Sequence, residues 1–333
     1  MRTAISGTGI ASTCCAHLLG LHGIEVLLTP AVRPPVPAIL LSDPALALLR
    51  DVFGRPDLFA DRPCIARRIV SWGGGEPIAL PHGAVVVSEG DLVTALSPMA
   101  ADTASGVPAD FTIHTAAPFP AGDMMRFGTR SAMAARVHLN FAEDEATCWI
   151  EAVDGGWLFL IPDGGAQSAW LLCVGGPIEA LLDESRHISP RVTLSGSTSS
   201  AFETCPRMLT RLQGTDWLAC GTAALAFDPI CGDGTAHAIR EAIIASAVIA
   251  AIRDGGDAEA LRTHHESMLI AAMRRHLLLC AQFYQSGGTG RWWQDQLGAL
   301  SQGHDWATSR LATMPEPRYH LRDFSLVPRE AAA

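Results

Sequence analysis

The sequence predicts an α/β protein. A glycine-rich turn joins a strand to a helix at the N-terminus, and four strand-like segments separated by turn residues occupy the middle of the chain. A long apolar helix follows a second glycine-containing turn. Together these observations predict a Rossmann-like domain, a mostly antiparallel β-sheet domain inserted into it, and a C-terminal helical segment.

Composition narrows the classes of function. The chain has 333 residues, of which 48% are hydrophobic and 17% charged, so it can bury a large core. Its formal net charge of −10 argues against nucleic-acid and membrane partners. Its nine cysteines show no metal-ligand spacing, so we expect reduced thiols, no metal site and a cytoplasmic location.

The N-terminal unit has the order strand, helix, strand. We expect strands at 3–6 and 25–28 and a helix at 10–22, joined by the turn Ser6-Gly7-Thr8-Gly9-Ile10-Ala11-Ser12. The first glycine permits a tight turn, and the second lets the backbone approach a pyrophosphate at the helix N-terminus. Thr29 stands where such turns have an acid for the ribose. The candidate cofactor residues here are Gly7, Gly9, Ile10, Ala11, Ser12, Thr29 and Arg33.

The remaining elements follow in order along the chain. Helices are expected at 43–53 and 90–97, with a hairpin between them at 65–87 and an Ala-, Pro- and Gly-rich crossing at 98–125. Strands are expected at 136–139, 147–153, 156–161, 168–174 and 217–220. Helices at 235–253 and 257–284 precede a glycine turn and an aromatic-rich tail. The predicted nucleotide domain is 1–97 with 201–255, the substrate domain is 98–200, and the helical region and tail are 256–333.

The stretch 217–242 carries the most specific motif. It resembles the second FAD motif of flavin monooxygenases and flavin-dependent halogenases, a Gly-Asp-Ala-Ala segment followed by Asp-Pro, a glycine turn and a long helix. The resemblance implies FAD contacts at Gly221, Thr222, Asp228, Pro229, Gly232 and Gly234, with Thr222 in place of the motif aspartate. A helix N-terminus at Gly234 and Thr235 would direct N–H groups at the pyrimidine edge of a flavin.

Other segments refine this resemblance. Residues 155–162 are similar to the Gly-Trp strand of the halogenases, but the chain contains no lysine, the residue with which those enzymes hold hypohalous acid. The segments 80–89, 228–241, 283–284 with 292–293, and 319–324 resemble LodB-like flavoproteins, which oxidise a tryptophan of a partner protein during quinone-cofactor maturation.

The resemblance implies an FAD-dependent monooxygenase that hydroxylates an aromatic substrate through a flavin C4a-hydroperoxide. The substrate would be an aromatic small molecule or a tryptophan-bearing protein, and electrons would come from NAD(P)H or a separate flavin reductase. His237, His82 and Trp157 are the candidate catalytic residues, although a buried helix histidine, a turn histidine and a core tryptophan are plainer interpretations. The alternatives are a flavin-dependent halogenase and a degenerate flavoprotein that binds a partner without turnover.

Overall fold

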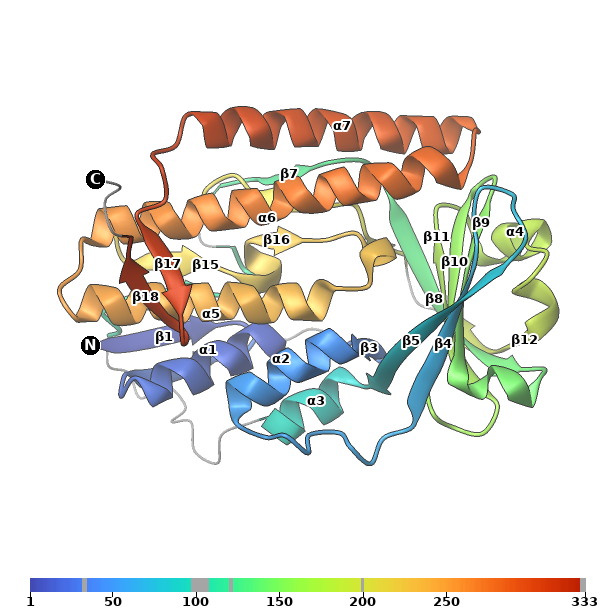
Figure 1. The fold of residues 1–333 in the computed structure, drawn as a ribbon, viewed down its shortest axis with the longest axis horizontal. Helices are drawn as coiled ribbons and strands as arrows, with labels where there is room; N and C mark the ends of the chain where they lie inside the picture. Colours follow the sequence, from blue (N-terminus) through green and yellow to red (C-terminus); the bar gives the residue numbers. More distant parts are fainter. Residues whose placement is uncertain (32–34, 97–107, 120–121, 199–200, 330–333) are drawn as a thin grey trace.

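The computed structural model describes residues 1–31, 35–96, 108–119, 122–198 and 201–329. It confirms the predicted α/β class, with two large sheets and a C-terminal helical layer (Figure 1). In that view the nine-stranded sheet stands at the right, and the long helices lie roughly parallel to one another across the picture.

A four-stranded parallel sheet contains the N-terminus. Its order is β15-β6-β1-β2, and the strands span Trp217–Ala219, Phe111–His114, Arg2–Ser6 and Glu25–Thr29. β1, α1 (Ile10–Leu21) and β2 form the predicted strand–helix–strand unit. β6 and β15 lie on the other side of β1, so the strand order reverses beside β1. Open α/β sheets bind their ligands at such a reversal, outside the carboxyl ends of the strands.

The second sheet has nine strands. Its order is β12-β8-β11-β10-β9-β4-β5-β3, with β13 also paired to β8, and only the β4–β9 pairing is parallel. The strands are β3 (Ile39–Ser42), β4 (Cys64–Ser71), β5 (Ile78–Val87), β8 (Ser131–Leu139), β9 (Thr147–Val153), β10 (Gly156–Pro162), β11 (Ser168–Val174), β12 (Val192–Thr198) and β13 (Phe202–Glu203). The four central strands that the sequence predicts are thus confirmed as a mostly antiparallel sheet.

Smaller elements complete the strand inventory. A three-stranded sheet contains β7 (Met124–Arg126), β14 (Arg207–Leu209) and β16 (Leu225–Ala226), and a hairpin contains β17 (Tyr319–Arg322) and β18 (Ser325–Pro328). The 3₁₀ turns are η1 (Ala142–Ala146), η2 (Ser189–Arg191), η3 (Gly221–Ala223) and η4 (Pro229–Cys231).

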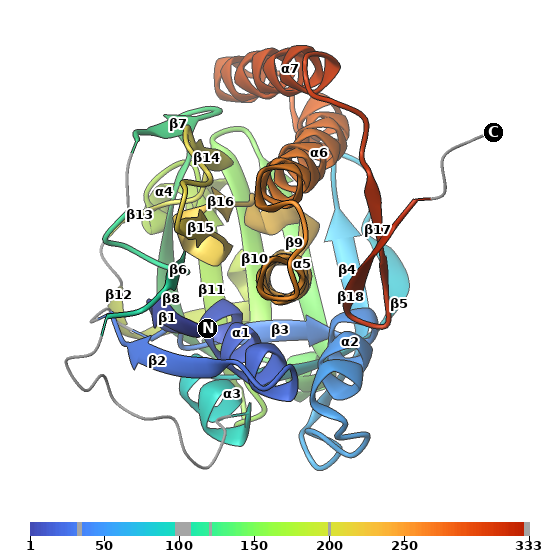
Figure 2. The same cartoon turned by 90° about the vertical axis from the view of Figure 1, so that its left-hand side faces the viewer.

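The helices cover the parallel sheet and extend to the large sheet. They are α1, α2 (Asp43–Phe53), α3 (Glu89–Leu96), α4 (Ile178–Glu184), α5 (Gly234–Arg253), α6 (Ala258–Gly287) and α7 (Arg291–Ala312). α5 packs between α1 and α6, and α7 lies along α6 on the outside, as Figures 1 and 2 both show.

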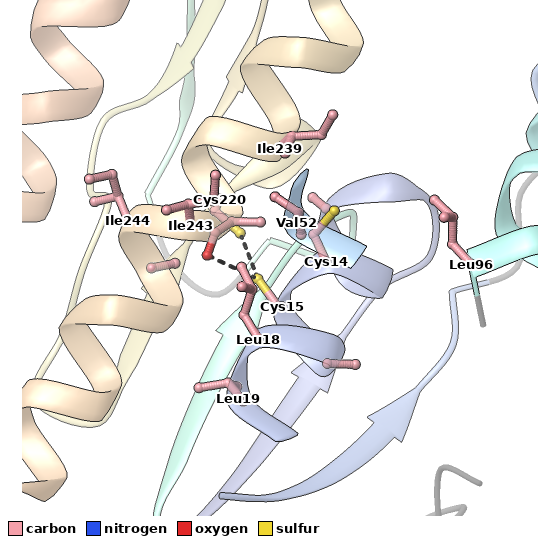
Figure 3. Packing of buried hydrophobic residues seen from close by; sticks show 14 of the residues in the cluster. Cys14, Cys15, Leu18, Leu19, Val52, Leu96, Cys220, Ile239, Ile243 and Ile244 are labelled. Carbon is pink, nitrogen blue, oxygen red and sulfur yellow. Dashed lines mark hydrogen bonds between the residues drawn. The ribbon is translucent and has the colours of Figure 1, made fainter. Parts of the chain in front are cut away.

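α5 is a core helix. Within the described residues it is the one helix long and apolar enough to cross a membrane, but 67% of its most apolar window is buried in the protein. Figure 3 shows Ile243 of α5 close to Cys15 of α1 and Cys220, whose Sγ atoms lie 3.8 Å apart. A helix that is apolar on all sides fits such a position because neighbours surround it.

The sheets cross the expected domain limits in two places. β3, β4 and β5 come from the expected nucleotide domain but pair within the large sheet, and β6 comes from the expected crossing at 98–125 but completes the parallel sheet. The rest of that crossing falls partly outside the described residues. The division of the chain into domains stays a prediction.

The expected aromatic-rich tail is wrong for residues 291–312, which form α7. Its buried side chains recur every three or four residues at Trp293, Gln296, Leu300, Gly303 and Ala307. This is the period of a helix with one face against a neighbour, here α6. β12 was likewise not expected from the sequence.

Candidate functional site

A cavity of about 300 Å³ lies at the carboxyl ends of β1, β6 and β15. Its walls come from the turn after β1, the residue after β6, the η3 turn after β15, and the first two turns of α5. It is lined mostly by apolar atoms, as small-molecule sites usually are. Seven of the candidate cofactor residues line it, namely Gly9, Ile10, Ala11, Gly221, Thr222, Gly234 and Thr235. The two motifs, more than half the chain apart, therefore meet at one cavity.

The turn after β1 leaves the start of α1 open toward this cavity. Gly7 and Gly9 have φ angles of 133° and 97°, which favour glycine. A Cβ at Gly7 would lie 2.2 Å from Thr115 Oγ1, so Gly7 allows close packing against the end of β6. α1 has no side-chain cap and no acid in its first turn, and its first N–H groups are available to an anion.

Besides Gly7, three residues of the first motif are not among those that line the cavity. Ser12 is buried, and its hydroxyl donates to Gly7 O at 3.4 Å. Thr29 is exposed at the end of β2, where its carbonyl accepts from Gly7 N at 2.9 Å. Arg33 lies outside the described residues.

The η3 turn packs directly on α1. Gly221 has a φ of 57°, and a Cβ there would lie 2.7 Å from the Cβ of Ala11. The hydroxyl of Thr222 donates to Thr115 O at 3.2 Å, which ties the turn to the end of β6. Glycine at 221 is therefore required by both conformation and space.

Glu241 lines the cavity, although the sequence did not single it out as a site residue. It lies on α5 and is 5% exposed, and its Oε2 accepts from Gly221 N at 2.7 Å. Burial raises the pKa of this carboxyl well above 4.5, and the Gly221 N–H only partly opposes that shift. Glu89, at the start of α3, also lines the cavity and accepts from Val36 N at 2.9 Å. Both acids lie in segments that the sequence analysis singled out, but packing between distant elements brings them to the cavity.

Asp228 is held by protein groups rather than facing the cavity. Its Oδ2 accepts from Arg130 Nε at 2.8 Å and from the Tyr284 hydroxyl at 2.9 Å, while its Oδ1 accepts from Ile230 N at 3.0 Å. Both side chains of the Arg130–Asp228 ion pair are 0% exposed. Burial raises the pKa of Asp228, and the Arg130 charge opposes that shift. Pro229 and Gly232 belong to the same turn, and none of the three lines the cavity.

Trp157 belongs to the same buried network. It is 0% exposed, and its indole N–H donates to the Tyr284 hydroxyl at 3.1 Å. This position corresponds to the plainer interpretation of a core tryptophan. Its catalytic role stays a prediction.

His82 is connected to the residue after the η4 turn by Arg68, which the sequence did not single out. Arg68 Nη2 on β4 is 2.9 Å from His82 Nε2 on β5, and it is 3.6 Å from where a Cβ on Gly232 would lie. Burial and then the Arg68 charge lower the pKa of His82. A neutral imidazole that accepts from Arg68 results.

His237 lies on α5 just beyond the cavity wall. Its ring contacts the ring of Phe227, which does line the cavity, in a tilted arrangement with centroids 4.2 Å apart. Its Nε2 is 3.6 Å from Asp233 Oδ2. Burial lowers the pKa of His237, while Asp233 opposes that shift. The structure thus groups His82 with Gly232 and His237 with Phe227, but neither histidine lines the cavity.

No family model and no curated protein matches the chain. Solved structures do match. A peptidyl tryptophan dihydroxylase, QhpG, essential for tryptophylquinone cofactor biogenesis, is 17% identical with a TM-score of 0.69, over 98% of this chain and 86% of that chain. The flavin-dependent halogenase CmlS is 16% identical with a TM-score of 0.76, over 93% and 72%. The myxobacterial chondrochloren halogenase CndH is 15% identical with a TM-score of 0.71, over 95% and 91%. The structural resemblance expected from the sequence is thus confirmed: this chain has the fold of flavin-dependent halogenases and of a tryptophan dihydroxylase.

Proposed function

We propose that the chain is a flavin-dependent oxidoreductase that binds FAD in the cavity between α1, η3 and α5. The observation that carries this proposal is that the N-termini of α1 and α5 open onto the same cavity. α1 begins without a side-chain cap and without an acid in its first turn. α5 begins after Asp233, whose carboxylate does not cap the helix but accepts from Arg240 Nη1 at 3.0 Å. Such ends attract negative charge, which FAD carries on its pyrophosphate and, when reduced, on its pyrimidine edge.

The residues at the cavity fit this cofactor. Gly9, Ile10 and Ala11 would hold the pyrophosphate with backbone N–H groups. Thr222 has the position of the motif aspartate that would contact the ribityl chain, and Glu241 lies next to it at Gly221 N. The raised pKa of Glu241 favours a protonated carboxyl, which would avoid repulsion with the phosphates. The start of α5 would then meet the pyrimidine edge.

Bound FAD would supply electrons for the activation of O₂. The protein's own part would be to orient an aromatic substrate, exclude water and move one proton. His82 and His237 are the groups we propose for the proton, since burial favours the neutral imidazole in both. Electrons would come from NAD(P)H or from a separate flavin reductase.

For the substrate we propose an aromatic group, and specifically the side chain of a tryptophan in a partner protein. The shared fold with a peptidyl tryptophan dihydroxylase over nearly the whole chain supports this choice. Halogenation is the second candidate, because several halogenases share the fold, but the chain offers no lysine for it. The third candidate is a partner-binding protein without turnover, motivated by the threonines at 29 and 222.

FAD titration of the cofactor-free protein tests the binding proposal. We expect a dissociation constant of about 1 μM or below, followed by flavin fluorescence. Ala238→Trp would fill the cavity and weaken binding by at least about 10-fold, which is about 1.4 kcal/mol. Gly20→Trp is the matched control, since Gly20 is exposed with open space around it. No binding at about 1 mM FAD, or equal binding by both variants, contradicts the cavity assignment and favours the partner-binding alternative.

Turnover separates the two enzyme candidates. The FAD-loaded protein would be incubated with a flavin reductase, O₂ and tryptophan-containing peptides, with and without chloride or bromide. Oxygen incorporation that does not depend on halide supports hydroxylation. Products that form only with chloride or bromide would contradict hydroxylation and support halogenation.

A further inference from the structure

Three side chains with metal-binding atoms converge outside the cavity lining. Cys231 ends the η4 turn, and His276 and Cys280 lie on α6. The two sulfur atoms are 3.6 Å apart, Cys280 Sγ is 3.2 Å from His276 Nε2, and all three ligand atoms lie within 4.8 Å of one another. His276 and Cys280 are four residues apart, so they share one face of the helix. Across the described ranges, no other group of three or more such ligands comes this close together.

We propose that Cys231, His276 and Cys280 form a binding site for a thiophilic divalent cation of the Zn²⁺ class. Tetrahedral zinc holds sulfur at about 2.3 Å and imidazole nitrogen at about 2.0–2.1 Å, which separates two sulfurs by about 3.8 Å and sulfur from nitrogen by about 3.6 Å. The Sγ–Sγ and Cys280 Sγ–His276 Nε2 separations fall short of these by a few tenths of an ångström, and Cys231 Sγ lies within 4.8 Å of His276 Nε2. Small side-chain rotations would therefore admit the ion.

The imidazole already presents the required lone pair. His276 Nε2 accepts from Asp228 N at 2.8 Å, so this nitrogen is unprotonated and points toward the η4 turn. A bound cation would take that lone pair in place of the Asp228 N–H. Each thiol would release its proton to solvent as its sulfur binds the ion, so affinity should rise with pH.

The half-buried Cys231 offers a route for the ion, and three protein ligands leave the fourth position of a tetrahedral site to water or another small ligand. Cys231 is half-buried, while His276 and Cys280 are buried. Two cysteines and one histidine are the protein ligands of catalytic zinc in alcohol dehydrogenase, where the fourth position takes water or substrate. The other close thiol pair, Cys15 and Cys220, has a backbone carbonyl beside it instead of an imidazole (Figure 3). It is therefore not proposed as a site.

The consequence of binding would be local. The ion would fasten the η4 turn, which lies between Asp228 and Gly232, to α6. The site depends only on these three side chains, so it stands whether or not the chain binds FAD.

Titration of the full-length, metal-free, reduced protein with Co²⁺ and Zn²⁺ tests the site. We expect one ion per chain, visible thiolate–Co²⁺ absorption that Zn²⁺ abolishes, and a rise in the unfolding temperature with Zn²⁺. Cys231→Ser and Cys280→Ser should each lower Zn²⁺ affinity by at least about 100-fold, and His276→Gln by at least about 10-fold, as loss of one ligand requires. Cys64→Ser, at an exposed cysteine, should leave affinity unchanged.

Several results would overturn the site. One is the absence of Co²⁺ absorption in protein whose thiols are reduced by thiol assay and whose fold is intact by circular dichroism. Another is full retention of binding in His276→Gln, since that makes the site a pair of thiolates. A third is equal loss in Cys64→Ser. If Cys280→Ser fails to fold, Cys231→Ala at the half-buried position carries the test alone.

Discussion

The buried carboxyl of Glu241 gives a sharp prediction about the dependence of stability on pH. Glu241→Gln keeps the size of the side chain and a carbonyl oxygen for Gly221 N, which now lies 2.7 Å from Oε2. It removes only the ability to ionise. Burial raises the pKa of Glu241 in the folded protein well above the ordinary 4.5.

The sign of the effect follows from this direction. Between pH 4.5 and the raised pKa, the folded protein binds one more proton at this site than the unfolded chain does. Stability from this group is therefore complete below pH 4.5 and is lost as the pH rises through that interval. The loss amounts to about 1.4 kcal/mol per pH unit. Glutamine does not ionise, so the variant has no such loss. The free energy of unfolding of the variant should therefore rise relative to that of the wild type by about 1.4 kcal/mol per pH unit.

Urea denaturation at pH 5, 6, 7 and 8 measures this gain. Taking the difference between variant and wild type removes the contribution of every other titrating group. Glu76→Gln, at an exposed carboxyl, serves as the control for the substitution itself. A flat difference for Glu241→Gln, or one that falls with pH, would refute the conclusion that this carboxyl is neutral in the folded protein.

Three further predictions concern stability. Asp228→Ala should lower the free energy of unfolding by about 3–5 kcal/mol, because the Arg130 charge would be left buried without its ion-pair partner. Thermal unfolding of the double variant Asp228→Ala with Arg130→Met measures how much of this stability is recovered. His265 is fully buried, neither ring nitrogen has a hydrogen-bond partner, and burial lowers its pKa to about 3. Stability that depends on the neutral ring is therefore lost as the pH falls from 6.5. His265→Leu should raise the unfolding temperature, most of all near pH 5. Gly221→Ala should cost about 1–3 kcal/mol in chemical denaturation through its positive φ and its closeness to α1, whereas Gly20→Ala, with open space around it, should be neutral or stabilising.

The parts of the fold that the sequence predicted are those with a local cause. The glycines of 7–9 and the alternation at 147–174 act within a few residues, and α5 is apolar enough to identify alone. β6 escaped because four residues between Ala- and Pro-rich segments carry too little pattern, although pairing with β1 and β15 fixes it as a strand. α7 escaped because its period becomes visible only when polar Gln296 and Gly303 are counted on the buried face.

The candidate site divides in the same way. Glycine turns are readable in the sequence, and both reach the cavity. Glu241 and Arg68 gain their positions from contacts between distant elements, which no spacing encodes. Asp228 is the opposite case, a residue that the motif indicated as a cofactor contact. In the structure it pairs in the core with Arg130, 98 residues away in the chain. The cysteines lacked a metal spacing for the same reason, because Cys231 and Cys280 lie 49 residues apart.

The strand order of the parallel sheet also bears on when the cavity can form during synthesis. The residues that line the cavity run from Thr8 to Glu241. β15, which precedes the η3 turn in the cavity wall, pairs with β6 more than 100 residues earlier in the chain. Long sequence separations of this kind slow folding and leave early segments without partners. The N-terminal β-α-β unit therefore emerges from the ribosome well before the residues that complete its ligand site. A nascent chain would be unable to retain the proposed FAD until α5 has been made, so synthesis of this helix is the step at which folding and the proposed cofactor loading become linked.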